Sequence, residues 1–200
     1  MRRPLTIPHR LARIALCTIL MITCAKHGCA QSYSQQKLRM ILADCGSMRI
    51  LASHMETLQK CRMANLIPLV SPIWDEYRIS SRFGTRMHPI LKEWKFHNGL
   101  DLSCPAGVRV HATAEGVVCF SGNKNGYGKC VVIRHLYGFE TIYGHLARTH
   151  AALGQRIHIG DVIGFVGSSG MSTGPHLHYE IRKKGRVVEP FITRKQTKNL

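Results

Sequence analysis

Apolar residues follow two different periodicities, one in the first part of the chain and another in the rest. Over residues 34–65 they recur at about every 3.6 residues, at Leu38, Ile41, Leu42, Cys45, Met48, Ala52 and Met55. This spacing predicts one or two amphipathic helices, which are interrupted near Gly46 and end before Pro68. We therefore expect residues 31–76 to form a helical pre-domain and linker, which acts as a spacer or packs on the following domain.

Beyond this segment, short stretches of β-favouring residues alternate with glycine-containing turns. The stretches that predict strands are residues 108–114, 116–120, 129–135, 140–145, 161–166 and 178–182. Strands this short and this closely spaced favour an antiparallel all-β domain over βαβ units. We expect a mainly β protein, in which a compact antiparallel β-sheet catalytic domain at residues 77–193 follows an N-terminal helical extension.

The first thirty residues have the pattern of a secretory signal. Four arginines precede an apolar run at residues 14–25, and small residues follow it. The run is shorter than the about 20 residues that span a membrane comfortably. Residues 1–30 are therefore predicted to be a signal peptide or a retained membrane anchor, and the protein to be exported to the periplasm or cell envelope. A lipoprotein signal at Cys24 is the weaker alternative, since Ile22 and Thr23 fit such a motif poorly.

The 200 residues suffice for one ordinary domain with an extension, and the apolar fraction of 44% suffices for a core. The net charge of +17 is spread along the chain, with +6 in residues 1–76, +8 in 77–193 and +3 in the basic tail 194–200. Because no single basic stripe forms, nucleic-acid binding is not expected. Anionic envelope polymers or a membrane surface are the partners that the charge favours; a merely soluble basic surface is the alternative.

Eight cysteines accompany this predicted export. Five of them lie beyond the signal region, at Cys45, Cys61, Cys104, Cys119 and Cys130, and an oxidising compartment would allow some of them to pair. None has C-x-x-C spacing, so a cysteine-bound zinc site is not expected. The last three lie in strand-like surroundings, which favours small buried thiols.

Histidines and one aspartate supply the candidate chemistry. His176 and His178 lie two residues apart on a predicted strand, so both side chains point to the same face. His97 and Asp101 lie four residues apart, and His145 stands alone before a leucine. A catalytic zinc site takes three His, Asp, Glu or Cys ligands and leaves one position for water. His97, Asp101 and His178 complete such a set, with His176 and His145 beside it.

These motifs resemble those of the lysostaphin/LytM-type zinc metallopeptidases, peptidase family M23. The family's His-x-x-x-Asp motif is matched by His97 and Asp101, its His-x-His motif by His176 and His178, and its lone histidine by His145. The resemblance extends over more than half of the chain. It implies a compact β-sheet fold with an active-site groove across one sheet, one Zn²⁺ per domain, and catalytic roles for His176 and His145.

The chain has no His-Glu-x-x-His motif, so no helix-borne glutamate is available as general base. His176 is the candidate base, and His145 would orient the water or stabilise the tetrahedral oxyanion; which of the two takes the proton stays open. Glu180 either orients a zinc ligand or forms a structural salt bridge. Arg82 and Arg86 are candidates to bind substrate carboxylates, with solvated or backbone-bonded arginines as the alternative.

The family branch that cleaves glycine bridges tends to have a catalytic tyrosine before the first zinc histidine, and residues 91–96 contain none. The sequence of residues 174–180 is more similar to that of the Gram-negative envelope endopeptidases, which cut D-alanyl cross-links. We expect a zinc endopeptidase that acts on peptidoglycan stem peptides. The alternatives are a non-catalytic LytM-type regulator of a cell-wall amidase and a biotinyl/lipoyl-like module, suggested by residues 160–164. LytM-type regulators have usually lost zinc ligands, whereas this chain has all three. A biotinyl/lipoyl-like module needs an acceptor lysine at a hairpin tip, and residues 167–170 contain no lysine.

Overall fold

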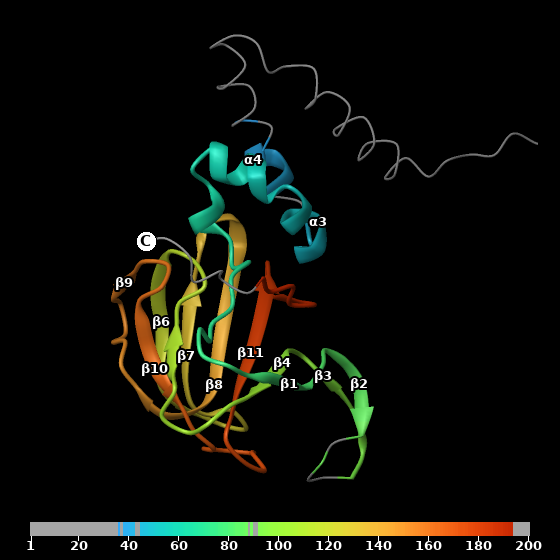
Figure 1. Cartoon of the computed structure of the whole chain (residues 1–200), viewed down its shortest axis with the longest axis vertical. Coiled ribbons are helices and arrows are strands. Elements are labelled where there is room, and N and C mark those ends of the chain that lie inside the picture. Colours follow the sequence, from blue (N-terminus) through green and yellow to red (C-terminus); the bar gives the residue numbers. More distant parts are fainter. Residues whose placement is uncertain (1–35, 37, 43–44, 88, 90–91, 194–200) are drawn as a thin grey trace, which may run out of the picture. The chain divides into compact units, whose positions relative to one another are not determined.

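The computed structural model describes residues 36, 38–42, 45–87, 89 and 92–193 (Figure 1). The predicted signal or anchor at 1–30 and the basic tail at 194–200 lie outside the described residues. The chain divides into two compact units, residues 1–42 and 43–200. In the first unit, residues 38–42 are helical. No helix of the described part is long and apolar enough to cross a membrane.

Two short helices and a 3₁₀ turn precede the strands. They are α3 (Met48–Ser53), α4 (Met55–Lys60) and η1 (Ala64–Leu66). The chain is not helical at residues 45–47, as expected around Gly46, and the Ser47 side chain caps α3 by accepting a hydrogen bond from the Ile50 amide. Met48, Leu51 and Leu58 are buried on the inward face, which accounts for the helical periodicity.

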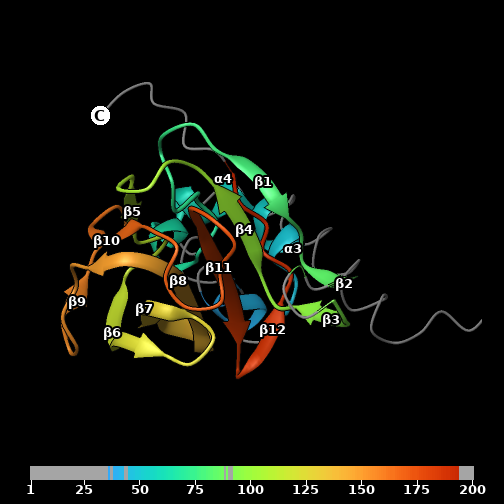
Figure 2. The same ribbon diagram turned by 90° about the horizontal axis from the view of Figure 1, so that it is seen from below.

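Antiparallel strands make up the rest of the second unit (Figure 2). Ten of them form one sheet: β1 (Arg78–Ser81), β4 (Leu100–Ser103), β5 (Arg109–His111), β6 (Gly116–Lys124), β7 (Gly128–Arg134), β8 (Phe139–Thr149), β9 (Arg156–Ile157), β10 (Val162–Val166), β11 (His176–Lys183) and β12 (Arg186–Val188). The main path runs β1-β4-β11-β8-β7-β6-β9; β10 pairs with β5 and β8, and β12 pairs with β11. A 3₁₀ turn, η2 (Leu136–Gly138), joins β7 to β8.

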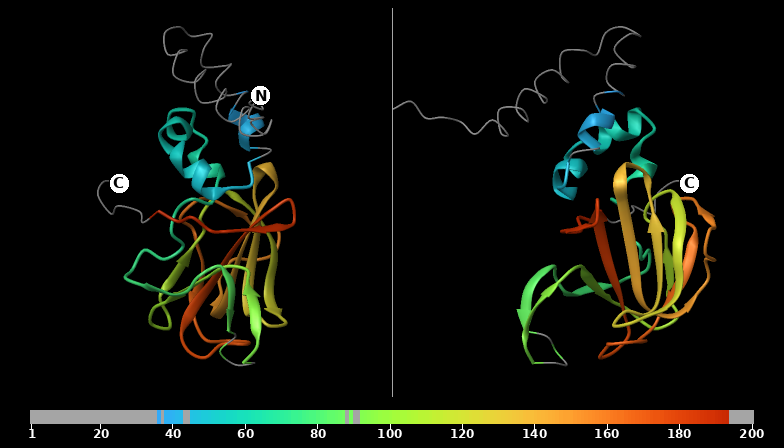
Figure 3. Two further views of the ribbon diagram at one scale, coloured as in Figure 1. Left: turned by 90° about the vertical axis from the view of Figure 1, so that its right-hand side faces the viewer. Right: turned by 180° about the vertical axis from the view of Figure 1, so that it is seen from behind.

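A separate two-stranded sheet consists of β2 (Gly84–Met87) and β3 (Trp94–His97). The right view of Figure 3 shows this hairpin standing clear of the larger sheet, and Figure 1 shows it next to β1 and β4. His97 is the last residue of β3, and the chain then enters β4 after two residues. The hairpin therefore delivers the first candidate ligand to the edge of the ten-stranded sheet.

The mainly β, antiparallel fold class with helices before it is confirmed. All six predicted strands are present, although their ends differ; β8, for example, continues to Thr149. The pattern missed β1 to β4, β9 and β12. Those strands have two to four residues, and β1 and β3 are mostly exposed, so they lack the alternation of buried and exposed positions that identifies a strand.

Strand β11 separates the core from the site by simple alternation. Leu177, Tyr179 and Ile181 point to the core and are fully buried. The hydroxyl of Tyr179 lies 2.9 Å from the Thr113 hydroxyl, which also lies 2.9 Å from that of Tyr143. These core contacts fix β11, so the side chains on its opposite face are held in place.

The five described cysteines beyond the signal region are all free. The pairing that an oxidising compartment would allow is therefore not formed among these residues. Cys104 and Cys130 are buried as expected, whereas Cys119 is only partly buried. Burial raises the pKa of both thiols to about 11, with the nearby Asp75 charge adding to the effect at Cys104. Both thiols thus stay protonated and act as small apolar side chains.

His135 is a buried histidine remote from the candidate site. Its Nδ1 donates to the Glu115 carbonyl oxygen at 2.7 Å, and its Nε2 lies 2.7 Å from the Thr141 hydroxyl. Burial lowers the pKa of His135 to about 4, although the Glu115 carbonyl opposes the shift. The neutral ring is thus the form that the fold accommodates.

We expect the free energy of unfolding to decrease on acidification because of His135. The unfolded histidine titrates at about 6.5, so the unfolded chain binds the proton first. The His135 contribution is complete above pH 6.5 and is lost as the pH falls through about 4, a change of about 3 kcal/mol. Urea unfolding from pH 7 to 4 measures it, and the decrease should be smaller in His135→Gln. Equal decreases in both proteins would contradict the prediction.

Candidate metal and catalytic site

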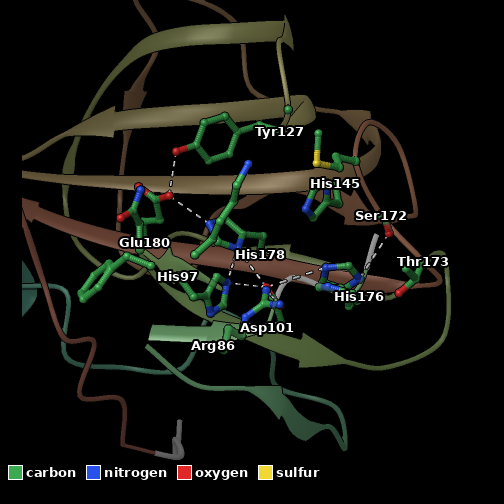
Figure 4. A pocket seen from close by; sticks show the side chains of 16 residues that line it. Arg86, His97, Asp101, Tyr127, His145, Ser172, Thr173, His176, His178 and Glu180 are labelled. Atoms are coloured by element: carbon green, nitrogen blue, oxygen red, sulfur yellow. Dashed lines mark hydrogen bonds and ion pairs between the residues drawn. The ribbon is translucent and has the colours of Figure 1, made fainter. Parts of the chain in front are cut away.

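Two segments that are distant in sequence, residues 97–101 and β11, place His97, Asp101 and His178 side by side (Figure 4). His178 on β11 pairs directly with Asp101 on β4. The His178 Nδ1 lies 2.8 Å from Asp101 Oδ1, and the His97 Nε2 lies 3.1 Å from both of these atoms. All three residues are 7% exposed. The structure thus brings together the three residues that the sequence grouped as metal ligands.

Gly99 makes this approach of β4 to β11 possible. A Cβ atom at Gly99 would lie 2.3 Å from the carbonyl oxygen of Tyr179, a backbone atom that cannot move aside. Any side chain at this position would push the two strands apart. The glycine between His97 and Asp101 is therefore required by the contact that also sets the distance from Asp101 to His178.

The tautomers of the two ligand histidines follow from their outer hydrogen bonds. His97 Nδ1 lies 2.8 Å from the Arg82 carbonyl oxygen, and His178 Nε2 lies 3.0 Å from Glu180 Oε1. Both oxygens can only accept when Glu180 is ionised, so the outer nitrogens carry the protons and the inner nitrogens present lone pairs. Two nitrogen lone pairs and the Asp101 carboxylate oxygen consequently face one another.

Such a group of acceptors fits a cation. Ligand atoms bound to zinc at about 2.0–2.1 Å in a tetrahedron lie about 3.3 Å apart, close to the 2.8–3.1 Å separations found here. Without positive charge between them, three electron-rich atoms at this distance repel one another. The residues therefore have the chemistry and spacing of a site that could bind a metal ion.

The titration behaviour of the cluster points the same way. Burial alone would raise the pKa of the Asp101 carboxyl, but hydrogen bonds and charge from His178 and His97 outweigh it and hold the pKa well below its ordinary value. Burial alone would lower the pKa of His178, but hydrogen bonds to Asp101 and Glu180 raise it to about 9. The cluster favours a positive charge at its centre, so a metal ion and a proton compete for it.

Glu180 fulfils both alternatives that the sequence left open. Its Oε1 accepts hydrogen bonds from His178 and from the Tyr127 hydroxyl at 2.7 Å, and its Oε2 forms an ion pair with Arg182 at 3.0 Å. The side chain is 1% exposed. Burial would raise the pKa of Glu180, but the His178 hydrogen bond and the other contacts lower it to about 2. Glu180 is therefore an ionised acceptor that orients the His178 ring.

Tyr127 is a site residue to which the sequence assigned no role. Residues 125–127 could form either a plain hairpin tip, the favoured alternative, or part of the groove wall, and Tyr127 lines the groove and is half-buried. Burial and the bond to Glu180 raise the pKa of its hydroxyl to about 12, so it remains a donor. The glycine-rich turn that precedes Tyr127 was the available signal, but it did not reveal the contact with Glu180, 53 residues away.

His176 and His145 present their Nε2 atoms to the same groove. His176 Nδ1 lies 2.8 Å from the Gly174 carbonyl oxygen, and His145 Nδ1 lies 2.8 Å from the Ser169 carbonyl oxygen. A carbonyl only accepts, so Nδ1 is protonated in both rings and Nε2 carries a lone pair in the neutral form. The ring centroids are 4.7 Å apart, and His176 Nε2 lies 3.8 Å from Asp101 Oδ1.

His145 occupies a strained backbone conformation, with φ of 59°. Before this residue β8 pairs with β11, and after it β8 pairs with β10, while the pairing with β7 shifts register. A non-glycine residue in this region costs about 1–3 kcal/mol. Such irregularities re-aim side chains next to active sites. Burial lowers the pKa of His145 to about 4, with the Ser169 carbonyl opposing the shift, so the ring is neutral at ordinary pH.

These side chains line a groove of about 310 Å³. Arg86 and Lys95 from the hairpin, Phe96, and Ser172 and Thr173 from the loop before β11 complete its walls. The remaining described histidines do not line it. His111 stacks on Trp74, His135 is buried elsewhere, and His150 and His158 are exposed. His88 lies outside the described residues.

Comparison with known proteins identifies where these features recur. Residues 95–190 match the model of Peptidase family M23. Over 126 residues the chain is 53% identical to the DD-carboxypeptidase/endopeptidase Mpg of Neisseria meningitidis. This match covers 63% of this chain and 28% of that protein. The chain therefore spans less than a third of this relative.

Two solved structures agree with the fold. A zinc-containing peptidase from Vibrio cholerae is 33% identical, with a TM-score of 0.57, and the match covers 62% of this chain and 39% of that one. The catalytic domain of the prophage-encoded M23 protein EnpA from Enterococcus faecalis is 34% identical, with a TM-score of 0.54. That match covers 61% of this chain and 95% of the EnpA domain.

Proposed function

The chain belongs to peptidase family M23, and on this premise we propose that it is a zinc-dependent endopeptidase that hydrolyses peptide cross-links of peptidoglycan, with D-alanyl bonds as the favoured target. The observation that carries the proposal is the set of inward lone pairs on His97, Asp101 and His178 beside the Nε2 atoms of His176 and His145. The name of the Neisseria relative, a DD-carboxypeptidase/endopeptidase, supports the D-alanyl target.

His97 Nε2, Asp101 Oδ1 and His178 Nδ1 would hold the zinc ion. When bound, zinc supplies a water of lowered pKa and polarises the scissile carbonyl. The protein's part is to fix the orientation of the two histidine rings, because the Arg82 carbonyl and Glu180 accept the outer N–H groups and leave the inner nitrogens facing the ion. The resulting position of the three side chains is fixed before substrate arrives, so little reorganisation is needed.

His176 acts as the general base in this proposal. Its neutral ring accepts a proton from the attacking water at Nε2, while Nδ1–H stays bonded to the Gly174 carbonyl. As the new C–O bond forms and the C–N bond breaks, the same Nε2 returns the proton to the leaving amine nitrogen. The His176 Nε2 lies 3.8 Å from Asp101 Oδ1, which places it beside the ligand cluster.

His145 orients the attacking water. With Nδ1–H given to the Ser169 carbonyl, its neutral Nε2 can accept a hydrogen bond from water but has no proton to donate to an oxyanion. Of the two roles expected for His145, water orientation is therefore the one that its tautomer supports.

The protein would meet its substrate outside the cytoplasm. We base this on the pattern at residues 1–30, with either a cleaved signal or a retained anchor, and on the net charge of +17, which suits the anionic polymers and membrane surfaces of an envelope. A non-catalytic amidase regulator is disfavoured because all three ligands and both additional histidines are kept.

Incubation of the full chain with purified sacculi tests the proposed function. We expect cross-linked muropeptides to decrease and uncross-linked stem peptides to increase, as measured by mass spectrometry, with no change in glycan length. A chelator should stop the reaction and added Zn²⁺ should restore it. Intact cross-links with zinc-loaded protein, together with stimulation of a cell-wall amidase, would instead favour the regulator.

A further inference from the structure

We propose that Arg86 and Lys95 form a carboxylate-binding subsite beside the ligand cluster, which recognises the free carboxylate on the residue that follows the scissile bond. This inference rests on the proposed function, because it concerns the substrate of the same groove. The subsite belongs to the β2–β3 hairpin, which is separate from the sheet that carries most of the ligands.

The two cations are direct cross-strand partners. Arg86 on β2 pairs with Lys95 on β3, and both side chains line the groove. Residues paired in this way point to the same face, and like charges placed directly opposite destabilise the strand pair. A hairpin that keeps two cations together on its groove face is therefore stabilised by an anion that binds between them.

The described residues only partly neutralise this pair. Arg86 Nη2 lies 3.3 Å from Asp101 Oδ2, while its buried Nε has no hydrogen-bond partner among the described residues. Lys95 Nζ lies 3.6 Å from Glu93 at the exposed rim, where such a pair contributes little. The other oxygen of Asp101 faces His97 and His178. One carboxylate charge is therefore shared among Arg86 and the two histidines, so it neutralises Arg86 only in part. The groups that can meet an incoming acid are the partly exposed Lys95 ammonium and the part of the Arg86 guanidinium that reaches the groove, and not the buried Arg86 Nε.

The position of Arg86 matches the place where the substrate carries a carboxylate. Asp101 is a ligand in the cluster, and Arg86 is hydrogen-bonded to it, so the guanidinium lies next to the reacting centre. In a D-alanyl-D-alanine end, the carboxylate carbon of the last residue is about 2.5 Å from the scissile nitrogen. A diaminopimelate residue that accepts a D-alanyl cross-link carries a free carboxylate at the same place. Arginine binds carboxylates through paired, charge-assisted hydrogen bonds.

The carboxylate-binding subsite would also determine which peptide bond is cleaved. An internal peptide bond whose following residue lacks a free carboxylate would leave the two cations with only their partial partners, Asp101 and Glu93. Such a substrate would forgo the charge-assisted hydrogen bonds that a free carboxylate makes with them. The subsite would therefore select D-alanyl bonds that are followed by a free acid and reject ordinary polypeptide.

The test compares two synthetic stem peptides that end in D-Ala-D-Ala and differ only in a terminal carboxylate or carboxamide. With zinc-loaded full chain we expect kcat/KM to favour the carboxylate by at least about 10-fold, the loss associated with one charged hydrogen bond. Lys95→Gln should reduce this preference by about 10-fold, mainly through KM, while zinc content stays constant. Lys60→Gln, on the exposed surface of α4 and paired with Glu56, is the matched control and should keep the preference.

Equilibrium binding of the same two peptides, measured by calorimetry, separates this inference from the proposed function. If neither peptide is cut, the peptidase proposal fails, yet a preference for the carboxylate that Lys95→Gln removes would still support the subsite. Equal cleavage and equal binding of the two peptides by the unaltered protein would overturn the subsite and leave the peptidase proposal standing. An unchanged preference in Lys95→Gln would overturn it as well.

Discussion

Replacing Asp101 by asparagine is expected to abolish peptidoglycan cleavage and to reduce zinc affinity strongly. The decrease in affinity should exceed about 10–100-fold, which is the usual effect of removing a residue that only hydrogen-bonds to a ligand. The substitution keeps the shape but removes the negative charge that compensates a divalent cation. An amide oxygen turned to the cluster would also place its NH₂ group against Arg86, a donor facing a donor. Zinc retained after dialysis against a competing chelator and muropeptide release from sacculi measure the two effects.

Glu180→Gln is the graded comparison for this prediction. It removes the negative charge of the Glu180 carboxylate, to which Arg182 and the His178 N–H both donate, but keeps all three direct ligands. Zinc affinity should therefore decrease by about 10–100-fold, with partial activity retained. Thermal unfolding of both variants checks that the fold survives. An Asp101→Asn protein that holds zinc as tightly as the unaltered chain would contradict the assignment of Asp101 as a ligand.

The residues of the candidate site could be predicted from sequence because part of their geometry is local. His176 and His178 share a face as soon as residues 176–183 form a strand, and the structure has that strand as β11. The four-residue spacing of His97 and Asp101 is also local, although the glycine between them is required by a tertiary contact with the Tyr179 carbonyl oxygen. Bringing the segments together depended on the family resemblance, since no local pattern places residue 97 beside residue 178.

The residues around these side chains could not be predicted, because they contribute through tertiary pairing. The acceptors that set the tautomers of His97, His145 and His176 are backbone carbonyls, which any residue type supplies. Similarly, the positive φ of His145 arises where β8 changes partner strands, and the residue types around it do not predict that change. Sequence patterns describe side chains well and main-chain acceptors poorly.

The packing of the expected linker shows the same limit. Two prolines between residues 66 and 75 predicted a connection, yet Ile67, Leu69 and Ile73 are at most 2% exposed. The Pro72 carbonyl accepts from the His111 amide, which joins this segment to β5. Proline restricts the backbone to extended conformations but does not decide whether the extended segment lies free or packs against a sheet.

Replacing His176 by alanine is expected to decrease kcat by about 10²–10⁴-fold, the range for loss of a general base. Zinc content should stay unchanged, because His176 is not among the three residues whose ligand atoms converge. Initial rates on a muropeptide dimer, with zinc analysis of each sample, measure both effects.

His145→Asn is the matched comparison, because asparagine tolerates the positive φ that His145 adopts and so keeps the backbone of β8. If His145 orients water and His176 takes the proton, His145→Asn should lower kcat less than His176→Ala does. The reverse order of the two losses would assign the proton to His145. The two outcomes are distinguishable because each imidazole is held by its own carbonyl, so removal of one leaves the tautomer of the other unchanged.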